Sequence, residues 1–247
     1  MEQFPSSKIW IFMGSDDRLV KRKPRTTATL GRPKHARASA ERYLIVCEGT
    51  KTEPRYFHAL VNAQGINSQR VKIAPNNGNT PDKIVGHALQ LYEADYKNGD
   101  PFDAVYCVFD RDTHSTFEAA IAKIEMLKAE KKPFNAITFT PCFEYWLLLH
   151  FEFTDKAFTA MPKTSAGDAV AKALKVHMPH YTKGQPDIYS AVQSRAETAL
   201  KHAKRARKNA EKTGSTNPTT DVDKLVNLNE TSGNLNEKGY AKRGRST

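Results

Sequence analysis

Apolar runs and amphipathic stretches alternate along the middle of the chain. Residues 43–47 and 104–109 are apolar throughout, which is typical of strands buried on both faces of a sheet. Residues 71–74 and 134–139 predict two further strands. Between these runs apolar residues recur at helical spacing, with helices expected from about Pro54, Pro81 and Ser115. The pattern predicts an α/β fold with a parallel sheet of about four strands sandwiched by helices.

The two ends of the chain follow other patterns. Beyond residue 152 the sequence is helical and more polar, with helices expected near 165–177, from about Pro186 to Lys212 and from about Asp221 to Leu228. Residues 18–42 hold nine Lys or Arg and one acid, with little that can be buried. We therefore divide the chain into a basic, largely disordered segment (1–42), a core (43–152), a helical C-terminal extension (153–230) and a disordered tail (231–247).

The charge balance points to a polyanionic partner. The 247 residues include 38 Lys or Arg and 27 Asp or Glu, a formal net charge of +11. A nucleic acid is the simplest reason for this excess, and solubility alone is the alternative. None of the three cysteines has a metal-ligand spacing, and no apolar stretch is long enough to span a bilayer. We expect a cytoplasmic protein without membrane association.

Carboxylates follow two of the predicted buried strands. Glu48 comes directly after the first strand, and Asp110 and Asp112 come after the third. The carboxyl ends of parallel strands lie at one edge of a sheet, where ligands gather, so these three side chains are expected to meet. Carboxylate oxygens suit Mg²⁺ or Mn²⁺, and such ions promote phosphodiester chemistry. Each motif alone is also compatible with a solvated turn.

Other residues can join this site or have plain structural roles. Glu144 lies in a short apolar helix expected after Pro141, at the same edge of the sheet, and is either a site residue or a partly exposed carboxylate. Glu53 either contacts the metal or stabilises the positive end of a helix dipole. Lys51 and Arg111 flank the acids and are candidates for holding a phosphate, and Arg111 can equally be a structural ion-pair partner for a neighbouring acid. His150 is expected to be packed and hydrogen-bonded.

These motifs together resemble the Toprim domain, and more narrowly the RloB-like group of Toprim proteins. The resemblance covers roughly residues 40–230. It rests on the runs 44–49 with Glu53, Tyr56 and Phe57, then 108–112, 141–151 and 217–220. It implies a Rossmann-like Toprim fold, with Glu48 as acid, base or metal ligand and with Asp110 and Asp112 as ligands of Mg²⁺.

The resemblance also implies an activity and a setting. It implies a metal-dependent nuclease of bacterial antiphage defence or abortive infection, acting on RNA or DNA, tRNA included. Because an unregulated nuclease is toxic, control by an ATPase partner or by homo-oligomerisation is expected. The chain has no GxxxxGK[ST] motif of its own, so ATP hydrolysis would come from that partner.

A basic helix provides a second candidate surface. Seven Lys or Arg fall within the helix expected over 186–212, and either simple solvation or contact with phosphates explains them. The predicted phosphate contacts are Arg195, Lys201, Lys204, Arg205, Arg207 and Lys208.

Two rival functions remain open at this point. The first is a non-catalytic nucleic-acid-binding or adaptor protein, whose acidic residues would bind only a structural ion or a partner. The second is a nucleotidyl transferase such as a primase, for which the sequence supplies no separate nucleotide pocket. The chain also has no dinucleotide-binding fingerprint, no nucleophile elbow and no cysteine–histidine zinc array.

Overall fold

A computed structural model describes residues 41–76, 80–111 and 116–226 of the chain. Nearly all of the predicted basic segment and the whole predicted C-terminal tail lie outside these residues, as does Asp112. Within the described residues, no helix combines the length and apolar character that crossing a membrane requires.

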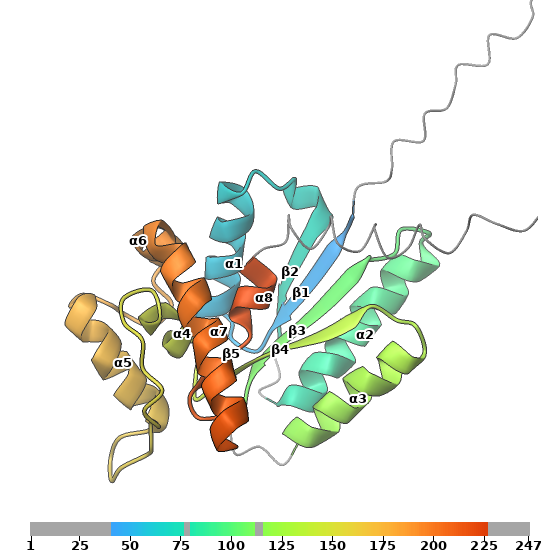
Figure 1. The fold of residues 1–247 in the computed structure, drawn as a ribbon. Coiled ribbons are helices and arrows are strands. Elements are labelled where there is room, and N and C mark those ends of the chain that lie inside the picture. Colours follow the sequence, from blue (N-terminus) through green and yellow to red (C-terminus); the bar gives the residue numbers. More distant parts are fainter. Residues whose placement is uncertain (1–40, 77–79, 112–115, 227–247) are drawn as a thin grey trace, which may run out of the picture. The chain divides into compact units, whose positions relative to one another are not determined.

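The core is a five-stranded sheet in the order β2-β1-β3-β4-β5 (Figure 1). The first four strands are parallel, as the alternation of strands and helices predicts. The fifth pairs antiparallel with β4 and was not predicted, because it has only two residues and no apolar run. The strands are β1 (Tyr43–Cys47), β2 (Val71–Pro75), β3 (Ala104–Asp110), β4 (Phe134–Thr140) and β5 (Thr219–Thr220).

The strand order places a topological switch point between β1 and β3. β2 pairs with β1 on one side, and the chain then crosses back so that β3 pairs with β1 on the other side. In the parallel register Cys47 lies opposite Val108, and Asp110 lies opposite Phe139 of β4. The carboxyl ends of β1, β3 and β4 therefore come out at one edge, and a switch point at such an edge is where open α/β sheets bind ligands.

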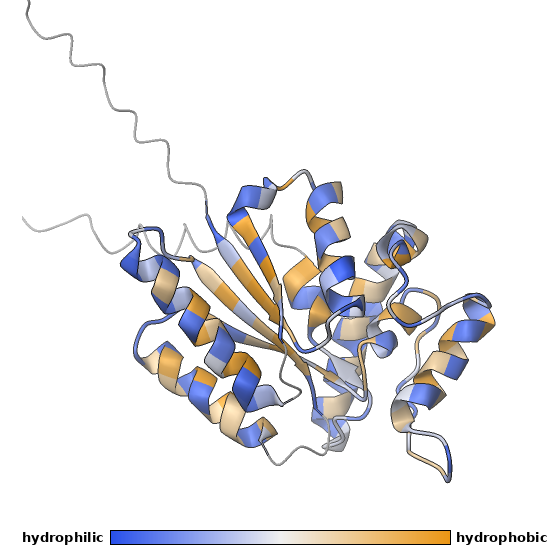
Figure 2. Ribbon diagram, turned by 180° about the vertical axis from the view of Figure 1, so that it is seen from behind, coloured by the Kyte–Doolittle hydropathy of each residue, from blue (hydrophilic) through white to orange (hydrophobic). Residues whose placement is uncertain are grey.

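Helices cover both faces of the sheet, which confirms the predicted layers (Figure 1). One face packs against α2 (Pro81–Lys97) and α3 (Phe117–Ala129), which contribute Ile84 and Ile124 to the core. The other face packs against α1 (Thr52–Ala63) and α4 (Glu144–Leu148). β1 is buried along its whole length, so both of its faces are apolar, and the central strands appear largely hydrophobic in Figure 2.

The C-terminal helices pack into the same apolar cluster as α1 and α4. The long helix expected from Pro186 to Lys212 is in fact interrupted, because the backbone at Arg195 is not helical (φ −112°, ψ 13°). No glycine or proline marks this break, so the sequence did not indicate it. The elements are α5 (Ala166–His177), α6 (Ile188–Val192), the 3₁₀ turn Gln193–Arg195, α7 (Ala196–Thr213) and α8 (Val222–Val226), with another 3₁₀ turn at Ser68–Arg70 before β2.

Candidate functional site

A polar pocket lies where β1 and β3 end. Its volume is about 440 Å³, and its walls come from the loop after β1, the start of α1, the end of β3 and a loop between α5 and α6. The lining residues are 48–53, Asp110, Lys183 and Gly184. Three carboxylates thus face one pocket at the switch point of the sheet, and we call it the acidic pocket.

A side-chain to backbone hydrogen bond joins the two strand ends. The backbone N–H of Asp110 donates to Oε2 of Glu48, with an N···O distance of 3.0 Å. The N–H of Glu48 in turn donates to the carbonyl of Val108 (2.9 Å), which continues the ladder between β1 and β3. The Glu48 carboxylate is therefore held in place at the end of β3, beside the first of the two predicted aspartates.

Glu53 supplies the third carboxylate of the acidic pocket. It lies in the first turn of α1 and is 9% exposed. Burial raises the pKa of the Glu53 carboxyl, and the nearby charges of Glu144 and Asp110 raise it further, while a backbone hydrogen bond and Lys183 lower it. The proximity of these charges shows that Glu53 belongs to the acidic group, beyond its favourable place at the helix start.

Gly49 leaves the room that Glu53 occupies. A Cβ atom added at Gly49 would lie 2.0 Å from Oε2 of Glu53, far inside contact distance. The glycine after the first strand is therefore needed for the close approach of the carboxyl group. The sequence contains this pair as Glu48-Gly49 and Glu53, but their contact depends on how α1 begins.

Glu144 lies beside the acidic pocket but does not line it. It opens α4, is 3% exposed and accepts a hydrogen bond from the Tyr181 hydroxyl to its Oε1 (3.0 Å). Nζ of Lys183 lies 4.0 Å from the same oxygen. Sequence reasoning missed Tyr181 and Lys183, because they belong to a loop with no motif and lie far along the chain from the strand ends.

The two predicted phosphate-holding residues lie in different places. Lys51 is exposed and lines the acidic pocket. Arg111 instead lines a neighbouring groove of about 350 Å³, together with Thr138 and the C-terminal end of α7. Its guanidinium stacks over the Phe117 ring (5.0 Å to the centroid) and pairs with Glu118 (3.4 Å). Of these two residues, Lys51 is therefore the one that lines the pocket of the carboxylates.

The donor set of the acidic pocket suits a hard divalent cation. In the described part of the chain no group of three or more His, Cys, Asp or Glu residues is already arranged to hold a metal. Mg²⁺, however, often takes only one or two carboxylates and keeps several waters. Glu48 and Asp110 lie at adjacent strand ends. Burial raises the pKa of Glu53 most, and the negative charges of Glu144 and Asp110, which add to this effect, are charges that a cation would offset. The third predicted ligand, Asp112, lies outside the described residues.

A family model, that of RloB-like proteins, matches residues 43–228 and spans the sheet, the acidic pocket and the C-terminal helices. The chain belongs to the RloB-like protein family. This confirms the resemblance to RloB-like proteins that the sequence motifs indicate. No curated protein matches the chain.

The RloB-like chain presents its basic helix largely to solvent. Lys201, Lys204, Arg205 and Lys208 are exposed on α7, and Arg195 is exposed just before it. The Arg205 guanidinium lies 3.8 Å from the centroid of the Phe153 ring, a stacking contact that orients the side chain and leaves its charge accessible. The predicted phosphate contacts, apart from Arg207, are thus all exposed on α7 or just before it, and we call them together the α7 surface.

The buried face of α7 in this RloB-like chain is made of alanines. Ala199, Ala203 and Ala206 are buried at helical spacing and let the helix approach the core closely. The small apolar side chains are enough to bury one side of it.

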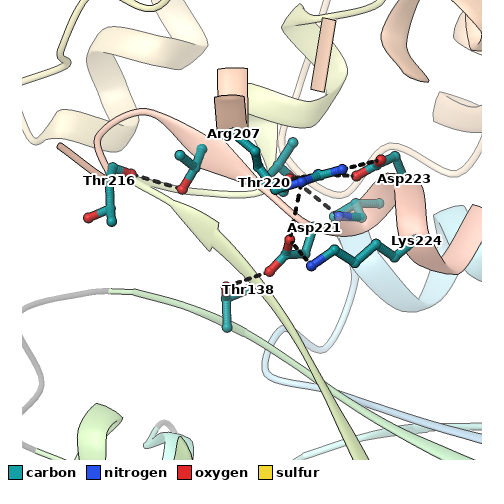
Figure 3. Close-up of polar contacts among 9 residues, drawn as sticks. Thr138, Arg207, Thr216, Thr220, Asp221, Asp223 and Lys224 are labelled. Carbon is teal, nitrogen blue, oxygen red and sulfur yellow. Dashed lines mark hydrogen bonds and ion pairs between the residues drawn. The ribbon is translucent and has the colours of Figure 1, made fainter. Parts of the chain in front are cut away.

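The structure gives Arg207 a different role from the predicted phosphate contact. Its side chain is 22% exposed and turns inward to Asp223, with the two nitrogens 2.5 and 2.7 Å from the carboxylate oxygens. It also donates to the carbonyl of Thr220 and lies 3.7 Å from Asp221 (Figure 3). A bidentate pair of this kind holds α7 against β5 and α8. We therefore assign Arg207 a structural role in this RloB-like chain and no longer count it among the predicted phosphate contacts.

Proposed function

We propose that this chain is a nuclease that uses Mg²⁺ or Mn²⁺ to cut RNA or DNA. The observation that carries the proposal is the meeting of Glu48, Glu53 and Asp110 in one pocket at the switch point between β1 and β3. The Toprim resemblance implies the same chemistry for Glu48 and Asp110. When bound, the cation supplies Lewis-acid polarisation of a phosphodiester and activation of water.

The residues of the acidic pocket divide into distinct roles. Glu48 and Asp110 hold the cation, with Asp112 as the further ligand that the resemblance implies. Glu48 also acts as the acid or base for proton transfer. Lys51, exposed at the start of α1, holds the scissile phosphate, and Glu144 supports the site through its contacts with Tyr181 and Lys183.

The α7 surface provides the contacts to the polyanionic substrate. Its exposed Lys and Arg belong to the same folded part of the chain as the acidic pocket. The groove lined by Arg111 reaches the C-terminal end of α7. Each phosphate that these side chains neutralise releases counterions, so binding would fall steeply with salt. We further propose a role in antiphage defence, tRNA among the substrates, and control by an ATPase partner or by self-association.

A cleavage assay tests this proposal. The purified full-length chain is incubated with separate pools of tRNA, single-stranded RNA and plasmid DNA, with Mg²⁺, Mn²⁺ or EDTA. We expect cleavage of at least one pool that requires metal and is abolished by Asp110→Asn. Glu125→Gln is the matched control, because Glu125 is an exposed carboxylate on α3 outside the site.

The outcome separates the nuclease from an adaptor. If the wild-type chain binds nucleic acid but cleaves no pool, alone or with an ATPase encoded beside it, the non-catalytic adaptor is the better account. The same holds if Asp110→Asn leaves the biological function intact while loss of residues 18–42 destroys it.

A further inference from the structure

A second pocket adjoins the acidic pocket. Its volume is about 370 Å³, and its lining includes Glu144, Asp168, Lys175 and Lys183. Lys183 lines both pockets, so its side chain stands at the boundary between them. We call this the α5 pocket, because α5 supplies one of its walls. Its size falls at the lower end of small-molecule sites, roughly 300–1,000 Å³, and is suited to a single small ligand.

Contacts before and after Lys183 in the chain hold its loop beside the acidic pocket. The Tyr181 hydroxyl donates to Glu144, and the Arg55 guanidinium donates to the carbonyl of Gly184. Gly184 has a positive φ of 80°, and a Cβ there would lie 3.0 Å from Cβ of Lys51. The loop therefore lies in close contact with the start of α1, and Lys183 keeps its place between the two pockets.

The charges that the α5 pocket presents to solvent favour an anionic ligand with polar groups. The Lys183 side chain is 78% exposed, whereas that of Glu144 is 4% exposed and accepts from Tyr181. Lys175 is exposed on α5, and no ion pair found among the described residues involves it. Asp168 uses its Oδ2 in the helix cap with Ser165. The accessible groups are thus two ammonium groups with hydroxyl and carboxyl neighbours.

We infer that the α5 pocket binds the nucleotide next to the scissile phosphate, and that Lys183, at the boundary of the two pockets, joins Lys51 in holding that phosphate. A lysine ammonium group pairs well with phosphate as a point charge. The hydroxyl of Thr182 and the carboxylate of Asp168 are suitable partners for the sugar and base of one nucleotide. The inference rests on the proposed nuclease function, because it takes the ligand to be part of a nucleic-acid strand.

Binding measured without metal tests this inference separately from catalysis. The full-length chain is titrated in EDTA with short fluorescein-labelled single-stranded RNA and DNA at several salt concentrations. We expect Lys175→Gln and Lys183→Gln each to lower the affinity by about threefold or more and to reduce the slope of log K against log[salt] by about 1. Lys172→Gln, an exposed lysine of α5 that does not line the pocket, is the matched control and should change neither.

A variant with unchanged charge tests whether a nucleotide occupies the α5 pocket, separately from electrostatic attraction to the lysines. Ala171 lines the α5 pocket, and Ala171→Phe would fill it without a change of charge. We expect a loss of affinity of about threefold or more although the charge of the chain is unchanged, and thermal unfolding of each variant checks its folding.

Two results would overturn the inference. If the two lysine variants behave like Lys172→Gln and Ala171→Phe binds as tightly as wild type, no nucleotide occupies the α5 pocket, and the nuclease proposal still stands. If the wild-type chain binds neither oligonucleotide, the inference and the nucleic-acid function on which it rests both fail.

Discussion

The backbone N–H of Asp110 donates to the Glu48 carboxylate across the switch point of the sheet, with 3.0 Å between N and Oε2. This contact joins the ends of β1 and β3, so one side chain has a structural task besides the chemical one that we propose for it. An amide side chain can accept the same hydrogen bond but cannot supply the charge. The two tasks are therefore separable by mutation.

Glu48→Gln should abolish activity and preserve the fold. The glutamine carbonyl still accepts from Asp110, so we expect the free energy of unfolding to change by less than about 1 kcal/mol. The proposed nuclease activity should fall by roughly 100-fold or more, because the proposed metal ligand and proton-transfer group are both lost. Urea unfolding and the cleavage assay measure the two quantities.

Glu48→Ala is the control for that separation. It removes the Glu48 acceptor of the Asp110 N–H. The free energy of unfolding should then fall by about 1–3 kcal/mol when no water replaces that acceptor. A Glu48→Gln protein that keeps full activity would show that the carboxylate has no chemical role.

Gly49→Ala tests the contact between Gly49 and Glu53. The new methyl group would lie 2.0 Å from Oε2 of Glu53, so the carboxyl group must move out of its position. We expect a loss of activity of about tenfold or more, larger than the loss for Gly86→Ala, since that glycine of α2 has open space around it. Equal activity of the two variants would mean that the position of Glu53 is unimportant.

The Arg207–Asp223 pair should contribute to stability and not to binding. Arg207→Met leaves the carboxylate of Asp223, 3% exposed, without its main partner, and should cost about 2–4 kcal/mol of unfolding free energy. Lys204→Gln, an exposed change on the same helix, should cost less than about 0.5 kcal/mol.

The same two variants should behave oppositely toward nucleic acid. Lys204→Gln should reduce the slope of log K against log[salt] by about 1, and Arg207→Met should leave that slope unchanged. A reduced slope for a folded Arg207→Met protein would restore Arg207 to the phosphate-binding surface.

His150 should make the fold sensitive to mild acid. Its ring is buried, Nδ1 contacts the carbonyl of Trp146 (3.0 Å), and burial lowers its pKa from 6.5 to about 4. The unfolded chain therefore binds this proton first, so stability is present above about pH 6.5 and is lost as the pH falls toward 4. The loss from this group is about 3 kcal/mol.

Urea unfolding at several pH values measures this loss. The difference between wild type and His150→Gln isolates the histidine, because other groups titrate in both proteins. Parallel stability curves for the two proteins between pH 6.5 and 4 would show that His150 does not titrate differently on folding.

Much of the fold could be predicted from the sequence because the signals were local. The apolar runs of β1 and β3 and the helical spacing of α2 and α3 depend on neighbouring residues, and the structure confirms them. The short strand β5 depends on pairing with β4, a contact between segments far apart in the chain, and no local pattern shows it.

The site was predictable to a similar extent. The ends of β1 and β3 placed Glu48 and Asp110 together, since parallel strands align their carboxyl ends. Lys183 and Tyr181 reach the site through a loop whose course follows from tertiary packing, so only the structure reveals them. Arg207 looked like its exposed neighbours because its partner, Asp223, lies on another helix.

The acidic pocket is proposed to bind a divalent cation, and calorimetric titration of the full-length chain with Mn²⁺ tests this binding most directly. We predict saturable binding that Glu48→Gln and Asp110→Asn each weaken by at least about tenfold, while Glu125→Gln binds like wild type. Absence of Mn²⁺ binding to the folded wild-type chain, or equal binding by all four proteins, would contradict the account.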